Sequence, residues 1–452
     1  MNEQSDPAAG ILDHCVAQIR RVAVQVLPDP VLDRARQALV DWMAVGLAGI
    51  CDPEARALAE TVHRWGGSGA APTLDGRRAS APSAALINGA AAHTLDFDDF
   101  HIASLLHPGA PTLAAVLASG YATRRTGAEM LAAFVAGFEV GARCGSGGLG
   151  EAMAAKGWHP TSILGHLSAA AAVSALLKLD DDASSRALGL AAVQAGGLMA
   201  AAGSFAKPFA VGKAAMNGVI AAELASVGGT APASLLDAPG RGLFGSLFQQ
   251  PTLPPTDAEQ PWLTLEDTFK PYPSCQLTHA AYEAGLLGRE GLGDLMPSAV
   301  SIIVNPLAPV IACHPSPRTV LEARFSLPYC VALGLQGRRA VLAEFSEQGL
   351  QDPVRRELAR RVSVVTDASV ARWAARIVVE TEDGRQFERD NPAALGSLDR
   401  PMGWSDLEAK FIDTVEPVLG SLAEPVLNAL KRFDSAGASE ELAQLLTRVA
   451  RR

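Results

Sequence analysis

The stretch LDRARQALVDWMAVGLAG, residues 32–49, indicates the fold class, because its apolar residues recur at helical spacing. Leu32, Ala35 and Leu39 fall on one helix face, and Asp29 before Pro30 is typical of an N-cap residue followed by proline in the first turn. Alanine-rich stretches of the same kind follow at 110–124, 127–142, 161–179, 183–199 and 211–226. Residues 10 to about 250 therefore predict successive helices, and their many Ala and Gly residues predict close packing between them.

The pattern changes after about residue 268. Short β-branched runs occupy 298–304 and 361–367, and residues 376–390 hold Asp383-Gly384 between two strand-like runs, which predicts a hairpin. Further helices are expected at 277–288, 316–322, 339–360 and again over 403–450. The expected fold is mainly α: a large all-helical domain built from 1–268 and 403–452, with a smaller α+β lid domain inserted at 269–402.

Composition limits the classes of function. The 452 residues are 48% hydrophobic, enough for two domains with large cores, and the net charge of −10 argues against nucleic-acid binding. No Lys or Arg run indicates a membrane surface, and the apolar run 187–203 is predicted to be a buried core helix. The spacing of the six cysteines fits neither a zinc site nor a disulfide framework, and the opening segment does not resemble a signal peptide. These two features predict a reduced, cytoplasmic protein.

Two motifs resemble binding or catalytic sites. Residues 145–150, GSGGLG, match a nucleotide-binding pattern, but the residues before them look helical, so no such site is expected. The stretch HTLDFDDFHIASLLHPG, 93–109, crowds three histidines and three aspartates together. A metal site, an acid–base site and a polar loop are all open; the spacing matches no known ligand set, so no metal is expected. In the simplest interpretation, Asp98 and Asp99 cap a helix or turn and His93 is a satisfied core histidine.

Four phrases place a titratable residue directly before proline. They are His107-Pro108, His159-Pro160, Lys207-Pro208 and Lys270-Pro271. Proline favours an extended conformation for the preceding residue, and the first three phrases are followed by long apolar helices, whose N-termini attract anions. The set predicts a site for a small polycarboxylate, in which lysines bind carboxylates and histidines move protons without any cofactor.

Six phrases together resemble the MmgE/PrpD family of 2-methylcitrate dehydratases, cis-aconitate decarboxylases and an iminodisuccinate epimerase. They are INGAAAHTLDFDD (87–99), LLHPGAPTLAA (105–115), GWHPTSILGHLSAAAA (157–172), KPFAVGKAAMNGV (207–219), KPYPSCQLTHAA (270–281) and ARFSLPYCVALGL (323–335). The resemblance implies a homodimer, a helical domain with an α+β lid, and a site without metal or cofactor. It implies active-site roles for Asp96, His107, His159, Lys207, Lys270 and Tyr329.

The sequence departs from the family pattern at several positions that would line the substrate site. Phe100 stands where many members have Thr, Cys275 where the decarboxylases have His, Ala210 where a His is common, and Lys213 where Arg or Asn is found. These residues make the expected pocket more apolar.

The sequence therefore predicts a lyase that dehydrates a small di- or tricarboxylic acid and binds neither nucleic acid nor membrane. His159 and His107 would be its acid–base pair, Lys207 and Lys270 its carboxylate-binding groups, Asp96 the residue that orients a histidine and Tyr329 a proton donor. Epimerisation, decarboxylation and a catalytically silent acid-binding protein remain the alternatives.

Overall fold

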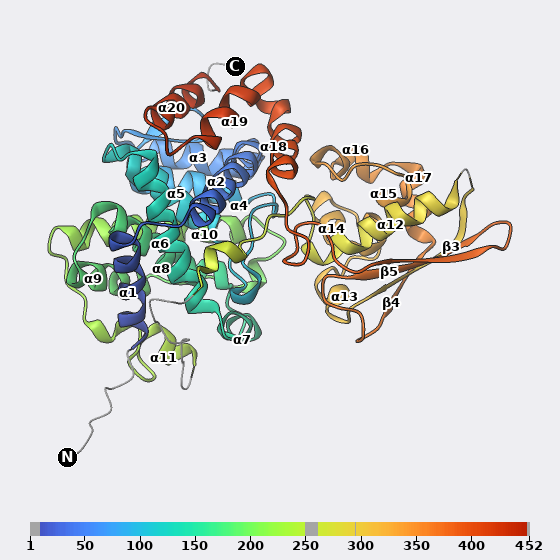
Figure 1. Cartoon of the computed structure of the whole chain (residues 1–452), viewed down its shortest axis with the longest axis horizontal. Helices are drawn as coiled ribbons and strands as arrows, with labels where there is room; N and C mark the ends of the chain where they lie inside the picture. The colour runs from blue at the N-terminus through green and yellow to red at the C-terminus, as the bar shows by residue number, and fades with distance from the viewer. Residues whose placement is uncertain (1–9, 249–260, 294, 450–452) are drawn as a thin grey trace, which may run out of the picture. The chain divides into compact units, whose positions relative to one another are not determined.

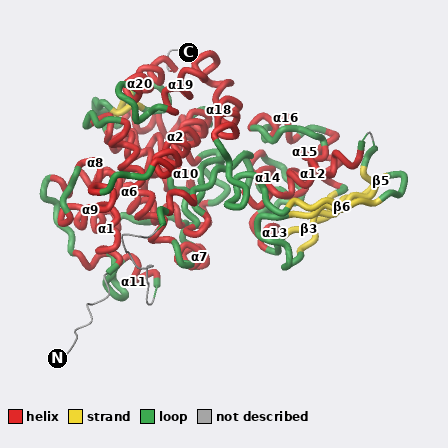
Figure 2. Tube along the Cα trace, in the orientation of Figure 1, coloured by secondary structure: helices red, strands yellow, loops and turns green. Residues whose placement is uncertain are grey.

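The computed structural model describes residues 10–248, 261–293 and 295–449 (Figure 1). The chain divides into two compact units: Met1–Asp267 with Leu407–Arg452, and Thr268–Asp406. Helices dominate, and the longer strands all belong to the second unit (Figure 2). The prediction of a mainly α fold is confirmed. Residues 1–9, to which the expectation about a signal peptide refers, lie outside the described residues.

The first unit is helical apart from the two-residue strands β1 (Ala71–Pro72) and β2 (Arg78–Ala79) in its described part. Its helices are α1 (Ile11–Val24), α2 (Asp29–Gly49), α3 (Pro53–Arg64), α4 (Ala81–His93), α5 (Gly109–Ala122), α6 (Gly127–Gly145), α7 (Leu149–Ala155), α8 (Pro160–Leu177), α9 (Asp181–Ala192), α10 (Ala206–Ser226), α11 (Leu243–Leu247), α19 (Ala423–Lys431) and α20 (Ala438–Val449). Helix α18 (Trp404–Leu419) leads from the second unit back into this one. The predicted helix boundaries hold to within a few residues for most of these, although Pro28, not Asp29, is the N-cap residue of α2.

Small residues allow the central helices to approach closely, as predicted. Helix α10 packs against α4 and α8, and α8 packs against α5 and α6. A Cβ atom on Gly212 of α10 would lie 2.4 Å from the Leu86 carbonyl oxygen of α4, so only glycine fits at this crossing. Helix α8 is long and apolar enough to cross a membrane, but 89% of its apolar window is buried inside the protein, which is typical of a core helix.

The run 187–203 is not one buried helix, and the expected helix at 183–199 is too long. Helix α9 ends at Ala192, and Val193 and Leu198 beyond it are largely exposed. Gly196 and Gly197 follow, and Gly197 adopts a φ of 148° that other residues rarely reach. Glycine also has a low helix propensity, so the apolar run turns away from the core instead of continuing the helix.

The second unit is an α+β arrangement around a four-stranded sheet. Strands β3 (Pro297–Val304), β4 (Val362–Thr366), β5 (Ala375–Thr381) and β6 (Gln386–Asn391) lie in the order β4-β3-β5-β6. β3 pairs parallel with β4 and antiparallel with β5, and β5 and β6 form the predicted hairpin around Asp383-Gly384. Helix α12 (His279–Leu292) packs against β5 and β6, and the buried face of the sheet contributes to the apolar core.

The other helices of this unit are short. They are α13 (Leu307–Ile311), α14 (Val320–Arg324), α15 (Leu327–Leu335), α16 (Glu347–Leu350) and α17 (Pro353–Arg360). The single helical piece expected at 339–360 is wrong, because Ser346 and Asp352 each cap a new helix within it. Pro353 begins α17 since proline fits the first turn of a helix but not its interior.

Candidate active site

The stretch 93–109 forms the connection between α4 and α5 in the first unit. His93 is the last residue of α4, and His107 precedes Pro108, the N-cap residue of α5. Asp96 adopts a left-handed conformation with φ of 52°, which aspartate tolerates better than most residues. The connection therefore turns sharply between the two helices.

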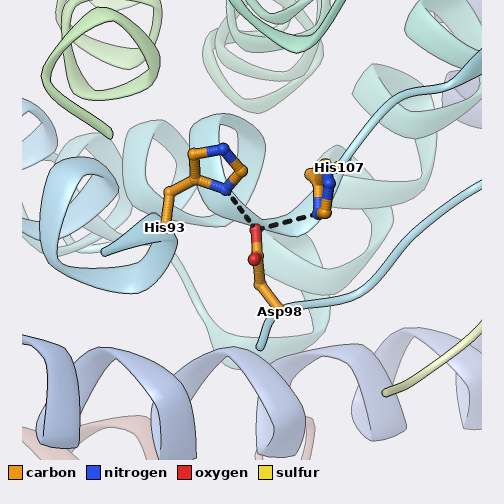
Figure 3. Close-up of side chains that lie close together, drawn as sticks. All are labelled: His93, Asp98 and His107. Atoms are coloured by element: carbon orange, nitrogen blue, oxygen red, sulfur yellow. Dashed lines mark hydrogen bonds and ion pairs between the residues drawn. The ribbon is translucent and has the colours of Figure 1, made fainter. Parts of the chain in front are cut away.

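Asp98 lies at the centre of a buried cluster that it forms with His93 and His107 (Figure 3). Its Oδ2 atom is 2.7 Å from Nδ1 of His93, a hydrogen bond, and 3.3 Å from Nδ1 of His107, an ion-pair distance. The two rings meet edge to face with centroids 4.8 Å apart. Predicting Asp98 as a capping residue was wrong, because its carboxylate faces two imidazoles instead of a helix end.

Asp98 is held in its ionised form. Burial alone would raise the pKa of this carboxyl, but the neighbouring His93 and His107 lower that pKa well below its ordinary value. A buried carboxylate is tolerated only where positive charge or hydrogen-bond donors surround it. The two imidazoles supply that environment.

His159 joins the cluster from the start of α8. It is the N-cap residue of that helix in an extended conformation, as predicted for a residue before proline. Its ring centroid is 5.9 Å from that of His93, and its Nδ1 is 2.7 Å from Oγ of Ser162. Burial and, after it, the charge of Lys207 lower the pKa of His159 to about 2. The ring is therefore neutral near pH 7, which is the form in which an imidazole can accept a proton.

Lys207 lies in the first turn of α10 and bonds to the connection between α4 and α5. Its Nζ donates to Oδ1 of Asp96 over 2.6 Å, and both side chains remain partly exposed, by 18% and 15%. The extended conformation expected for Lys207 is not found, because α10 already begins at Ala206. A proline in the first turn breaks no helical hydrogen bond, so Pro208 is accommodated there. An ammonium group thus stands at the edge of the cluster.

Asp99 caps α5, as predicted. The backbone N–H of Gly109 donates to both Asp99 carboxylate oxygens, over 2.8 and 3.0 Å. A Cβ atom at Gly109 would lie 2.7 Å from this carboxylate, so glycine is required for the contact. Burial and the nearby Asp267, Asp98 and Asp41 raise the pKa of Asp99 well above its ordinary value. The pKa values of the neighbouring carboxyls are therefore shifted in opposite directions, down for Asp98 and up for Asp99.

Lys410 of α18 bonds to the connection between α4 and α5. Its ammonium group is buried, lies 2.5 Å from Oδ1 of Asp41 on α2 and donates to the backbone carbonyl of Phe97 over 2.8 Å. The role of this lysine has no local sign in the sequence, because its acidic partner is 369 positions away. Lys410 fixes the backbone between Asp96 and Asp98.

Replacing Lys410 by methionine is expected to lower the free energy of unfolding by about 3–5 kcal/mol, because it removes the cation that balances a buried carboxylate. Urea unfolding followed by circular dichroism measures this. Lys431→Met, which removes an exposed lysine of α19, is the matched control and should change stability by less than about 0.5 kcal/mol. A loss below about 1 kcal/mol for Lys410→Met would contradict the assignment.

Of the two predicted substrate-binding residues of the first unit, Phe100 borders the histidine cluster and Lys213 lies on α10. The ring of Phe100 lies 4.9 Å from that of His107, so an apolar side chain borders the cluster. Lys213 lies further along α10, where burial lowers its pKa and where its charge acts on His166. His101, the third histidine of the stretch, instead pairs with Ser104 over 2.7 Å.

Lys270, Cys275 and Tyr329 belong to the second unit. Lys270 is buried in the segment before α12, and Cys275 packs within the apolar core of that unit. Tyr329 on α15 donates its hydroxyl to the Glu344 carbonyl and accepts a hydrogen bond from Arg355 over 2.7 Å. Burial raises the pKa of Tyr329, so its hydroxyl keeps its proton near pH 7.

His93, Asp98 and His107 are also the described residues that could hold a metal ion, since their ligand atoms lie within 4.8 Å of one another. The hydrogen bond between His93 and Asp98 already uses two of those atoms. The arrangement is that of two imidazoles on one carboxylate, a common way to orient histidines for proton transfer.

Comparison with known proteins places the chain in a family. Residues 16–256 match the MmgE/PrpD N-terminal domain, and residues 272–432 match the MmgE/PrpD C-terminal domain. The chain belongs to the MmgE/PrpD family. The predicted resemblance is thereby confirmed.

Several relatives of this MmgE/PrpD protein align over nearly its full length. A cis-aconitate decarboxylase from Homo sapiens is 28% identical over 96% of this chain and 94% of its own length. The cis-aconitate decarboxylase-like protein oryM from Aspergillus oryzae is 27% identical over 93% and 94%. A cis-aconitate decarboxylase from Aspergillus terreus is 27% identical over 88% and 86%. The family and these relatives support an enzyme of the lyase class.

Proposed function

We propose that this MmgE/PrpD protein is a cofactor-independent lyase that acts on a small acid with two or three carboxylates. The observation that carries the proposal is the convergence of three histidines, of which two share Asp98, with the Lys207–Asp96 pair. His159 is neutral and can therefore accept a proton, and Lys207 is suited to bind a carboxylate and to stabilise enolate charge.

Loss of CO2 is the reaction that we place first, whereas sequence analysis placed dehydration first. The relatives named above are described as cis-aconitate decarboxylases or decarboxylase-like, and they span nearly the whole chain. In such a step the carbon–carboxylate bond breaks with release of CO2, and its electron pair delocalises toward a remaining carboxylate held by Lys207. A proton that a histidine of the cluster takes up from solvent then passes to carbon.

Loss of water is the second candidate reaction, and the two histidines that share the Asp98 carboxylate favour it. Dehydration needs a base that takes a proton from carbon and an acid that gives a proton to the departing hydroxyl. His93 and His107 on Asp98, together with His159, offer enough imidazoles for both transfers. Lys270 and Tyr329 keep their predicted roles as a carboxylate-binding group and a proton donor. A homodimer, as the resemblance implies, and a cytoplasmic location, as the cysteine pattern predicts, are part of the same proposal.

Proton NMR in D2O with a panel of di- and tricarboxylic acids tests the proposal. Decarboxylation releases CO2 and gives a product with deuterium on carbon, dehydration gives new vinyl signals, and epimerisation exchanges the α-proton without changing the connectivity. Activity should survive dialysis against EDTA. Thermal stabilisation by an acid whose spectrum never changes would favour a silent binding protein and contradict the proposal.

Replacing Phe100 by threonine is expected to raise kcat/KM for cis-aconitate about tenfold relative to the preferred acid of the panel. The Phe100 ring borders His107, and the family resemblance implies Thr at this position, so the substitution provides space and a hydroxyl beside the cluster. Phe248→Thr, elsewhere in the first unit, is the matched control and should leave the ratio unchanged. An unchanged ratio in Phe100→Thr would mean that Phe100 does not select the substrate.

A further inference from the structure

The contacts of Asp98 define where the protons of two histidines lie. Asp98 is fully buried and ionised, so it can only accept hydrogen bonds. A neutral imidazole carries its proton on one nitrogen, and the nitrogen that faces a carboxylate is favoured as the N–H, because a lone pair there would be repelled. Nδ1 of His93 forms a hydrogen bond with Asp98 over 2.7 Å, and Nδ1 of His107 faces the same oxygen at the ion-pair distance of 3.3 Å (Figure 3).

With its proton on Nδ1, a neutral His93 ring carries a lone pair on Nε2. Nε2 of His93 is buried and has no hydrogen-bond partner among the residues that the structure describes. A buried polar atom without a hydrogen bond is destabilising, and a ligand that donates a hydrogen bond to it would remove that cost. His93 was predicted to be a satisfied core histidine, but only its Nδ1 is satisfied.

His93 also has the right neighbours for chemistry. Its ring is 4.8 Å from that of His107 and 5.9 Å from that of His159, so it lies beside both predicted catalytic histidines. An imidazolium formed at His93 or His107 would lie against the ionised Asp98 in a water-poor interior, where opposite charges attract strongly.

We propose that His93 is a second base of the site and that Asp98 is the positioning residue that fixes the tautomer of both His93 and His107. Nε2 of His93 then keeps a lone pair for the substrate, which would be the small polycarboxylic acid of the proposed function and would offer an acidic C–H or a hydroxyl. The inference rests on that function for its chemistry but not for its geometry. It adds two residues to the predicted site.

The tautomers can be measured without a substrate. The chain has nine histidines, so selective 15N-histidine labelling and long-range 1H–15N correlation near pH 7 can resolve them, with assignments from His93→Gln and His107→Gln. Both rings are expected to carry the proton on Nδ1, and at least one should change tautomer in Asp98→Asn. Protons on Nε2 of both rings in the unaltered protein would overturn the proposal, even if Asp98→Asn does not fold.

Kinetics then test the role of His93. His93→Gln is expected to lower kcat about 100-fold with KM changed less than threefold, per folded molecule. The control is His63→Gln, because His63 also pairs with a carboxylate, that of Asp75 over 3.2 Å, away from the cluster. Its kcat should be unchanged. A kcat within threefold of the unaltered protein in His93→Gln would overturn the role as base.

The two proposals fail in distinguishable ways. If no acid is turned over, the proposed function fails while the tautomer measurement still stands. If turnover is found but both Nε2 atoms are protonated, only this inference fails. One equivalent of a divalent cation in the purified protein, lost in His93→Gln, would also overturn it, because a metal would occupy the nitrogens assigned to N–H groups.

Discussion

Lys207→Met is expected to lower kcat/KM by about 10²–10³-fold. Lys207 places an ammonium group 2.6 Å from Asp96 at the edge of the histidine cluster, and it is suited to stabilise charge that develops on a substrate carboxylate. Removal of one preorganised charge-stabilising group costs an enzyme about this factor. Initial rates with the acid identified by NMR measure the effect.

Variants at the same position separate charge from geometry. Lys207→Arg keeps the charge but changes the shape of the donor, and it should recover only part of the activity. Lys431→Met removes a lysine from the exposed face of α19 and should leave kcat/KM unchanged. A rate for Lys207→Met within threefold of the unaltered protein would rule out a role in charge stabilisation. Since Lys207 is partly exposed, the loss should be in rate, with the protein still folded.

Periodic sequence features predicted most of the fold. Helix α2 and the hairpin around Asp383-Gly384 follow from local patterns, because apolar spacing and turn residues act over a few positions. The helix expected at 183–199 ends at Ala192, and the apolar pattern alone does not predict this end. Ala and Gly are compatible with a buried helix, and only the tertiary structure shows that Val193 and Leu198 face outward.

The candidate site was predicted unevenly for a similar reason. His159 before Pro160 could be placed at a helix start because proline constrains the residue ahead of it. The role of Asp98 was not predicted, because the family resemblance implied a site role for Asp96 and Asp98 was expected to cap a helix or turn together with Asp99. The turn at Asp96 decides which of them meets the histidines, and that turn is a left-handed conformation without a glycine to announce it.

His159→Gln is expected to lower kcat by about 10²–10⁴-fold, the range typical of a lost general base. Burial and the charge of Lys207 keep the ring neutral, and Ser162 occupies its Nδ1, so one nitrogen remains for the substrate. Glutamine retains a polar side chain but cannot take up a proton. The rate should therefore fall at every pH while the protein remains folded. A kcat within threefold of the unaltered protein would remove His159 from the mechanism.

The same variant should change how stability depends on pH. His159 titrates near pH 6.5 when unfolded and at about 2 when folded, so between these values the unfolded chain binds the extra proton. The free energy of unfolding therefore falls as pH drops below about 6.5, by about 1.4 kcal/mol per pH unit for this one group. Between pH 7 and pH 5, the free energy of unfolding of His159→Gln should fall by about 2 kcal/mol less than that of the unaltered protein.

Urea unfolding at both pH values measures this difference. His63→Gln is the control that should keep the full loss, because His63 is paired with Asp75 outside the cluster. Equal losses in His159→Gln and the unaltered protein would mean that folding does not lower the pKa of His159, which would contradict the effects of burial and of Lys207.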